Sequence, residues 1–382
     1  MDDRIFSIAL TLLPKINNFE CLKLIEACGG ISNFFREKDS SWALMCKAIG
    51  FDSLKIDRKK ALKGAEEELA NVEKYGIKIV NYENENFPKL LKNCLDAPLV
   101  LYYKGQLKPE TYQDIFLSIV GTRKATSYGI ELTKDLITRL TELAYRPTIV
   151  SGLAYGIDIA AHKAALKCGL PTYAVLGHGL NTIYPSQHYN YAMQILENNG
   201  ALISEYPVIS KTQSYNFLQR NRIVAGISQG TLVVESALKG GSMTTARVAF
   251  SYDREVMAFP GRQNDTYSLG CNQLIKQNIA SLVENAEDIL KVMNISEDKK
   301  ISSQIALDFT EENKNSDVFK QEKLNIIKIL KERDTSLNEL SQKTKISVQS
   351  LMIILLKMEI DGIISTIPGG YYRLNSKFIT RE

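Results

Sequence analysis

The chain has 382 residues, of which 45% are hydrophobic and 24% charged, and its formal net charge at pH 7 is +4. This composition is typical of a globular protein with one large core and one or two small domains, and it excludes a disordered or fibrous chain. The N-terminus lacks the basic and apolar regions of a secretory signal, and no apolar run approaches a membrane span, so we expect a cytoplasmic protein without a membrane partner.

The six cysteines are scattered without closely spaced pairs, and the chain has only three histidines. We therefore expect no disulfide framework, no metal site and no cofactor. The net charge is too small to identify a partner, so a site for a polyanion must come from local clustering of basic residues.

Residues 1–75 are predicted to be helical, because apolar residues such as Ile5, Leu10 and Leu22 recur at helical spacing. Two strand-like pieces follow, Ile77–Val80 and Pro98–Tyr103. We expect both pieces to extend one edge of a larger sheet.

From Ile115 to Leu290 the sequence repeats one unit: a short apolar run, a glycine turn and a helix. Each run is too short for a helix and apolar on both faces, as a strand buried in a parallel sheet must be. The predicted strands are Phe116–Val120, Thr148–Val150, Thr172–Leu176, Ala201–Ile203, Thr231–Val234, Glu255–Phe259 and Ala280–Val283. The predicted fold class is α/β, with an extended Rossmann-like, doubly wound and mostly parallel sheet.

The C-terminal part is predicted to be a separate small domain. Residues 294–319 are polar and aperiodic, and we interpret them as a flexible linker. In residues 320–382, three amphipathic helices, two of them capped by Ser336 and Ser347, precede a two-stranded hairpin, which is the pattern of a winged helix. The predicted domains are thus a helical domain at 1–75, a sheet domain at 76–293, the linker at 294–319 and a winged helix at 320–382.

Parallel sheets bind ligands at the carboxyl ends of their strands, where this sequence is rich in glycine, hydroxyl and arginine side chains. In the first turn, Gly121 lets the chain leave the strand sharply, and the next helix points its free N–H groups and dipole into the turn. Arg123 can grip a phosphate there, and Thr122 and Ser127 can donate hydrogen bonds to it. Only one glycine of a dinucleotide fingerprint is present, so NAD or FAD is not expected.

The later turns add weaker candidates. Ser151 and Gly152 open the second turn, where we expect Asp158 to suit the helix dipole and His162 to pack against the fold. In the third turn His178 is a candidate ligand contact, and Tyr184 supplies a ring near the same edge.

Two further segments suit a polyanion. The glycine turn at 240–245, with Gly241, Ser242 and Thr244, opens a helix and forms a second anion cradle. The run from Phe217 through Arg220, Asn221 and Arg222 is typical of a surface for the phosphates and bases of single-stranded nucleic acid. On a helix the two arginines point in nearly opposite directions, so we expect one to contact the ligand and the other to brace the fold or reach a neighbouring phosphate.

These motifs, in this order from about Gly76 to Leu290, resemble the bacterial DNA-processing protein A family, DprA or Smf: G-T-R, S-G-L-A-x-G-I-D, G-x-G-L-x-x-x-Y-P, S-E-Y, R-N-R-I-V-A-G, G-G-S-x-x-T-A and G-C-N-x-L-I. The resemblance implies a homodimer that binds single-stranded DNA, protects incoming DNA and loads the RecA recombinase in natural transformation, without being an enzyme. It also implies a helix-hairpin-helix or SAM-like fold for the N-terminal helices. The predicted DNA-binding residues are Gly121, Thr122, Arg123, Ser127, Ser151, Gly152, Tyr155, His178, Tyr184, Lys211, Phe217, Arg220, Asn221, Arg222, Gly241, Ser242, Thr244 and Asn272.

The chain departs from the family pattern at three places. Ser186 follows Tyr-Pro where relatives often carry a basic residue, so one phosphate contact is missing or moved to Lys211. The loop Pro14–Asn17 lacks the glycines of relatives, so we do not expect the N-terminal domain to grip DNA. Tyr155 replaces a basic or small residue and can stack on a base.

For the dimer, the sequence gives some support of its own. Val248, Phe250 and Tyr252 end one helix, and Leu274 and Ile275 lie on another, which is more apolar surface than one buried stripe needs. We predict Phe250 and Ile275 at a two-fold interface; the alternative is that all of these residues pack inside one chain.

Two other functions remain open. A Rossmann-like enzyme that hydrolyses the glycosidic bond of nucleoside monophosphates would need a carboxylate near the ribose, for which Glu235 is the candidate. A winged-helix reader of duplex DNA is disfavoured, because the helix from Val348 is apolar and offers Lys357 with few other phosphate contacts. For that tail, protein contact or packing is the better interpretation.

Overall fold

The computed structural model describes residues 3–13, 18–48, 57–108, 114–295, 323, 325–331, 333–360, 363–367 and 371–374. The chain divides into two compact units, Met1–Ile295 and Ser296–Glu382. The predicted linker, apart from its first two residues, and the loop Pro14–Asn17 lie outside the described residues.

The first unit begins with the predicted helices, which are α1 (Asp3–Thr11), α2 (Asn18–Cys28), α3 (Ile31–Arg36), α4 (Asp39–Ala48) and α5 (Arg58–Lys74). Phe6, Phe34 and Trp42 are buried among them. The cluster that contains these rings also contains Leu176 and Leu202 of the sheet region, so the N-terminal helices and the sheet share one hydrophobic core.

The centre of this unit is a nine-stranded sheet in the order β1-β2-β6-β5-β4-β3-β7-β8-β9. The strands are β1 (Lys78–Asn81), β2 (Val100–Gly105), β3 (Phe116–Val120), β4 (Thr148–Ser151), β5 (Thr172–Val175), β6 (Ala201–Ser204), β7 (Gly230–Val233), β8 (Glu255–Ala258) and β9 (Ser281–Leu282). Strands β3 to β9 pair in parallel, whereas β1 and β2 add antiparallel pairs at one edge. The predicted strands and the predicted fold class are confirmed.

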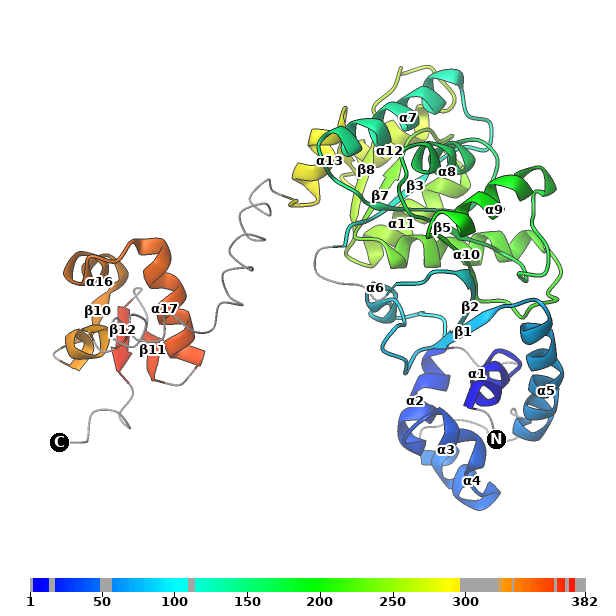
Figure 1. Cartoon of the computed structure of the whole chain (residues 1–382), viewed down its shortest axis with the longest axis horizontal. Coiled ribbons are helices and arrows are strands. Elements are labelled where there is room, and N and C mark those ends of the chain that lie inside the picture. Colours follow the sequence, from blue (N-terminus) through cyan, green and yellow to red (C-terminus); the bar gives the residue numbers. More distant parts are fainter. Residues whose placement is uncertain are drawn as a thin grey trace. The chain divides into compact units, whose positions relative to one another are not determined.

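Helices cover both faces of the sheet. They are α6 (Lys89–Lys92), α7 (Ser127–Glu142), α8 (Ile157–Lys167), α9 (Tyr189–Glu197), α10 (Ser214–Ile227), α11 (Gly241–Ser251), α12 (Leu269–Lys276) and α13 (Ala286–Val292), with a 3-10 turn, η2, at Ser186–His188. One core cluster joins the sheet to α7, α8 and α13, and another joins it to α10 and α11 (Figure 1). The central strands β3, β5, β6 and β7 are therefore buried along their whole length, which explains their short and mostly apolar sequences, whereas the edge strands β1 and β9 are more exposed.

The strand order reverses beside β3. From β3 the chain runs outward through β4, β5 and β6, and it then returns to β7 on the other side of β3. Connections at such a switch point leave in opposite directions, which opens a crevice beyond the carboxyl ends of β3 and β7.

The second unit contains a helical segment at 325–331, α16 (Leu337–Thr344), α17 (Val348–Ile360) and the strands β10 (Thr335–Ser336), β11 (Ile364–Ile367) and β12 (Tyr371–Leu374). Ser336 accepts a hydrogen bond from the backbone N–H of Glu339 and so caps α16, as predicted. The strand order is β10-β12-β11, all antiparallel. The predicted hairpin is therefore present with one additional short strand, β10.

Among the described residues, no helix is both long enough and apolar enough to cross a membrane. The same part of the chain contains no cluster of histidine, cysteine and acidic side chains that is suited to a metal ion.

Candidate nucleic-acid interface

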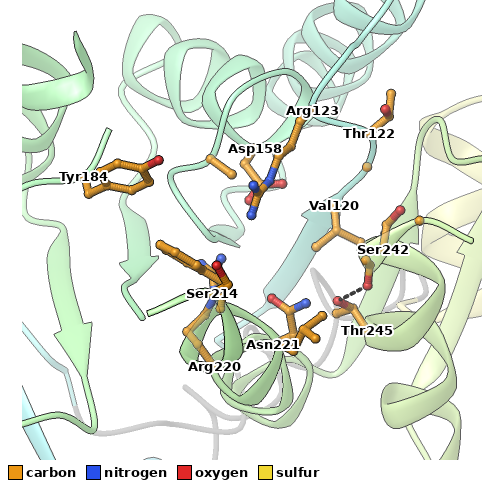
Figure 2. Close-up of a pocket in the computed structure, with 16 residues that line it drawn as sticks. Val120, Thr122, Arg123, Asp158, Tyr184, Ser214, Arg220, Asn221, Ser242 and Thr245 are labelled. Atoms are coloured by element: carbon orange, nitrogen blue, oxygen red, sulfur yellow. Dashed lines mark hydrogen bonds between the residues drawn. The ribbon is translucent and has the colours of Figure 1, made fainter. Parts of the chain in front are cut away.

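A cavity of about 380 Å³ lies in the crevice at the switch point. Its walls come from the segments after β3, β4, β5 and β7 and from one side of α10. In Figure 2, Arg123 reaches in from the loop after β3, Asn221 from α10, and Ser242 and Thr245 from α11. The lining residues are Val120, Gly121, Thr122, Arg123, Ala154, Asp158, Tyr184, Ser214, Phe217, Leu218, Arg220, Asn221, Gly240, Gly241, Ser242 and Thr245.

Arg123 is an exposed cation in this lining. Its guanidinium lies 5.6 Å from the centre of the Phe217 ring. Gly121 is needed just before it, because a β-carbon there would lie 2.5 Å from a side-chain carbon of Ile157 and 2.9 Å from the carbonyl of Glu235. The tight turn therefore places Arg123 at the rim of the cavity.

The N-terminus of α7, which the sequence suggested as a phosphate cradle, is occupied by Glu235. One carboxylate oxygen of Glu235 accepts the backbone N–H of Thr126 at 2.9 Å, and the other accepts the Thr126 hydroxyl at 2.5 Å. A β-carbon on Gly129 would lie 2.4 Å from the same carboxylate, so Gly129 makes room for it. The Glu235 carboxylate thus takes the place of an external anion at this helix end. Ser127, in the first turn of the same helix, is exposed and is not among the residues that line the cavity.

The N-terminus of α11 is different. Its first residues, Gly240 to Ser242, line the cavity, and Gly240 at the N-cap makes no side-chain capping bond. Gly241 is exposed, and nothing lies within 4 Å of the position of a β-carbon there. The Ser242 hydroxyl is directed inward and donates to Ser236 Oγ at 2.8 Å. The N–H of Met243 donates to the carbonyl of Gly240 at 3.1 Å, so the N–H groups of Gly241 and Ser242, together with the helix dipole, are the groups that favour an anion in this part of the cavity.

Arg220 lies beneath the cavity, with its side chain only 3% exposed. Its guanidinium donates to the carbonyl of Val175 and lies against Gly152, where a β-carbon would be 2.0 Å from Nη1. Gly152 therefore serves to admit Arg220, and its own N–H donates to Asp158 at 3.1 Å. Burial raises the pKa of Asp158, and the neighbouring Arg220 guanidinium acts against this shift.

Arg222 lies on another side of α10, as the helical spacing predicted. It donates to the carbonyl of Asp96 at 2.6 Å and forms an ion pair with Glu205, and its side chain is 11% exposed. It lines a second hollow of about 280 Å³, next to Glu205 and Tyr215. Neither arginine of the R-N-R run is thus an exposed phosphate contact: Arg220 supplies positive charge from below the cavity, and Arg222 braces the fold.

Three other predicted site residues form hydrogen bonds within the chain. The buried Ser151 hydroxyl donates to the carbonyl of Ile119 at 2.7 Å. His178 is buried with Nδ1 2.9 Å from the carbonyl of Gly179, and burial lowers its pKa. The Asn272 amide bonds the N–H and the carbonyl of Gly261 at 3.1 and 2.9 Å. These contacts hold the turns at the sheet edge in place.

The side chains of Asp158 and His162 are both buried. Asp158 lies in the first turn of α8, but its carboxylate accepts from the preceding loop rather than from the helix end. His162 packs in the core with Nδ1 2.7 Å from the Thr172 hydroxyl, and burial lowers its pKa to about 3.

Exposed rings border the cavity. Tyr184 is 48% exposed, and its ring centre lies 5.7 Å from that of Phe217. Tyr155, next to the lining residue Ala154, is also exposed but is not part of the lining. Lys211 and Thr244 are exposed and likewise lie outside it.

Several residues of the site were not predicted from the sequence. Ser214, Leu218 and Thr245 line the cavity. Thr245 lies within the glycine turn already identified, and Ser214 and Leu218 flank Phe217 on α10, so the helical period of that segment was the available signal. No local pattern connects Glu235 to Thr126, which is 109 residues away.

The predicted dimer residues line another hollow, of about 600 Å³, which is formed by α11, β8, α12 and β9. Phe250 is 52% exposed and Leu282 is 48% exposed, and Ile275 is partly buried beside them. Leu274 is fully buried in the core of the chain. The apolar residues of this region thus divide between the core and an exposed group.

Comparison with known proteins shows similarity to one protein family. The family model described as DNA recombination-mediator protein A matches residues 78–294. The chain is 35% identical over 323 residues to Protein Smf of Escherichia coli (strain K12), covering 82% of this chain and 81% of that protein. It is 36% identical over 223 residues to DNA processing protein DprA of Bacillus subtilis (strain 168), covering 58% of this chain and 73% of that one.

A solved structure is similar as well. The X-ray structure of DNA processing protein A (DprA) from Streptococcus pneumoniae has a TM-score of 0.55 and 29% sequence identity to this chain. The similarity covers 72% of this chain and 98% of that one.

Proposed function

The chain belongs to the DNA recombination-mediator protein A family, which includes DprA and Smf proteins, and on that premise we propose that its cavity binds the backbone of single-stranded DNA. The family resemblance predicted from the ordered motifs is confirmed. The family assigns the chain to DNA processing and recombination mediation; the ligand and its contacts are what we propose.

One observation carries the proposal: Arg123 and the open N-terminus of α11 meet at the same cavity. An arginine and free backbone N–H groups are the donors that suit a phosphate. The Tyr184 and Phe217 rings border the same space and offer faces on which a base can stack. Because every base has such a face, this combination favours single strands with little sequence preference.

The acidic groups of the site do not oppose an anion. Glu235 neutralises the end of α7, and Asp158 is buried between the Gly152 N–H and Arg220. The same contacts weaken the rival proposal of a nucleotide hydrolase, which requires a carboxylate poised beside a ribose. Glu235 is 7% exposed and holds Thr126. We therefore propose a binding protein without enzymatic activity, and release of free base from nucleoside monophosphates would contradict this.

A binding comparison tests the proposed ligand. Purified protein is titrated with fluorescent oligo-dT, with a duplex of the same length and with thymidine monophosphate. We expect tight binding of oligo-dT and weaker binding of the other two, because the rings at the cavity need unpaired bases and a chain of phosphates supplies several contacts. Tighter binding of the duplex would contradict the proposal.

We further propose that the protein acts as a homodimer through Phe250, Ile275 and Leu282. The exposed apolar group beside the hollow at β8 and β9 supports a self-complementary contact. The double substitution Phe250→Arg and Ile275→Arg should give a folded monomer that binds long oligonucleotides more weakly, since two linked sites gain avidity. Wild-type protein that is monomeric by light scattering at micromolar concentration would refute this, and an insoluble double variant would indicate that these side chains belong to the core.

Protection of incoming DNA and loading of RecA in the cytoplasm are proposals that come from the family resemblance. An assay for the second is the start of ATP hydrolysis by RecA on a single strand. We expect the lag before hydrolysis to shorten when the wild-type protein is added. With a variant that does not bind DNA, the lag should be as long as without the protein. An unchanged lag with the wild-type protein would remove RecA from the proposal.

A further inference from the structure

Tyr155 presents an exposed ring just outside the cavity. It follows the lining residue Ala154, and 43% of it is exposed. Its hydroxyl donates to Gln187 Oε1 at 2.6 Å, and its ring centre lies 5.0 Å from that of His188, with the planes 69° apart. The ring is therefore held at its hydroxyl and against His188, while much of the side chain remains open to solvent.

The groups that hold Tyr155 are themselves fixed. His188 is buried, and its Nδ1 lies 2.8 Å from the carbonyl of Leu153. Leu153 has a φ of 56°, in the left-handed region, which a side chain such as leucine adopts only when its surroundings impose it. On the other side of Tyr155, Gly156 has a φ of 77°, and a β-carbon there would lie 2.1 Å from the carbonyl of Thr122. The loop is thus locked against η2 on one side and against the turn that carries Arg123 on the other.

An ordered exposed ring beside a polyanion site is what a stacking surface requires. A base that stacks on a side chain already held in place loses little of its binding free energy to ordering that side chain. The nearby Tyr184 and Phe217 rings contact each other at the border of the cavity, whereas Tyr155 contacts neither of them. Tyr155 therefore offers a second aromatic surface, separate from the one at the cavity.

We propose that Tyr155 is an accessory base-stacking subsite, which takes the unpaired base of a nucleotide that lies outside the cavity on the same strand. The inference rests on the proposed function, because it assumes that single-stranded DNA crosses the cavity. It adds the prediction that the footprint extends past the cavity toward η2. It also assigns Gln187 and His188 as residues that position the ring.

The alternative is that Tyr155 only anchors η2 through its hydroxyl. The two roles need different parts of the side chain. Tyr155→Phe keeps the ring face and removes the hydrogen bond to Gln187, whereas Tyr155→Leu keeps an apolar side chain and removes the stacking face. A stacking role predicts a loss with leucine only, and an anchoring role predicts similar losses with both.

The experiment measures the affinity of full-length protein for oligo-dT of increasing length. Stacking of one base contributes at least about a fivefold gain in affinity. We expect Tyr155→Leu to lose at least fivefold on long oligonucleotides and nothing on thymidine monophosphate, and Tyr155→Phe to stay within about twofold of wild type. Phe19→Leu, which removes an exposed ring on α2, is the matched control and should bind as wild type does.

A direct readout accompanies the titration. In Tyr155→Trp, the indole should be quenched when oligo-dT binds, over the steady signal of the buried Trp42. Indole fluorescence that does not change while oligo-dT binds would overturn the inference even if the leucine variant folded poorly. Full affinity of a folded Tyr155→Leu, together with lost affinity of Arg123→Glu, would overturn it and leave the proposed function intact. A wild-type protein that does not bind single strands would refute both.

Discussion

Helices α7 and α11 start from neighbouring turns at the same edge of the sheet. They differ in the groups that accept hydrogen bonds from the N–H groups at their N-termini. At α7 the N-cap Thr126 accepts the backbone N–H of Gly129, and the two carboxylate oxygens of Glu235 accept the N–H and the hydroxyl of Thr126. The first turn of α11 has a glycine at its N-cap and no side-chain capping bond. An internal carboxylate closes one helix end, and the other remains open at the cavity.

The difference shows that a glycine turn followed by a helix does not by itself define an anion site. Both helix ends carry the same partial positive charge and the same free N–H groups. What separates them is the capping. At α7 the Thr126 hydroxyl accepts the N–H of Gly129 at 3.1 Å and is itself held by Glu235 from the segment after β7, whereas the N-cap of α11 is Gly240, which has no side chain to cap the helix. The open end and Arg123 then become the places where an external phosphate has no internal competitor.

The largest change in stability is expected when the carboxylate at the N-terminus of α7 is removed. Glu235→Ala leaves the N–H and hydroxyl of Thr126 without their buried acceptor, which should cost about 2 kcal/mol in free energy of unfolding. Urea unfolding measures this cost. Glu235→Gln keeps the shape and one acceptor oxygen, so its loss should be smaller. Equal stability of wild type and the alanine variant would mean that the contact does not hold the α7 end.

A charge reversal at the rim should act on binding and not on stability. Arg123→Glu is expected to weaken oligo-dT binding at least tenfold, or about 1.4 kcal/mol, because attraction for phosphate becomes repulsion. The thermal unfolding midpoint should stay unchanged, since Arg123 is exposed. Unaltered affinity in the folded variant would remove Arg123 from the site.

A carboxylate can also be introduced at the open N-terminus of α11. Gly241→Asp places a carboxylate at the first turn of α11, where nothing lies within 4 Å of the new β-carbon. We expect about fivefold weaker binding of oligo-dT, which corresponds to about 1 kcal/mol, and no loss of stability. Gly241→Ala is the matched control and should bind nearly as wild type does. If aspartate and alanine had the same effect, α11 would not face a phosphate.

The sequence predicted the sheet well and the site less well, for one physical reason. A strand buried on both faces must be largely apolar, so the strands at Phe116–Val120 and Thr231–Val234 can be predicted from their local sequence alone. The divergence of Arg220 and Arg222 also follows from the helical period alone. The strand β10 has only two residues, Thr335 and Ser336, and carries no such pattern.

The missing parts of the prediction depend on partners that are distant in the sequence. Arg220 is buried because Gly152 has no β-carbon and because Val175 offers its carbonyl. Glu235 belongs to the segment after β7 but serves a helix that follows β3. Neither relationship leaves a local signal, so the sequence could indicate the residue types of the site but not which of them remain free for a ligand.

The salt dependence of oligo-dT binding tests directly whether Arg123 and the N-terminus of α11 bind phosphates. If three to five phosphates are neutralised, the slope of log affinity against log salt concentration should be roughly −2 to −3.5, since single strands contribute about −0.7 per phosphate. In Arg123→Gln the slope should become shallower by about 0.7, because one phosphate contact is lost. A flat slope for the wild-type protein, or an identical slope for the variant, would contradict the assignment of Arg123 and the open end of α11 as the phosphate site.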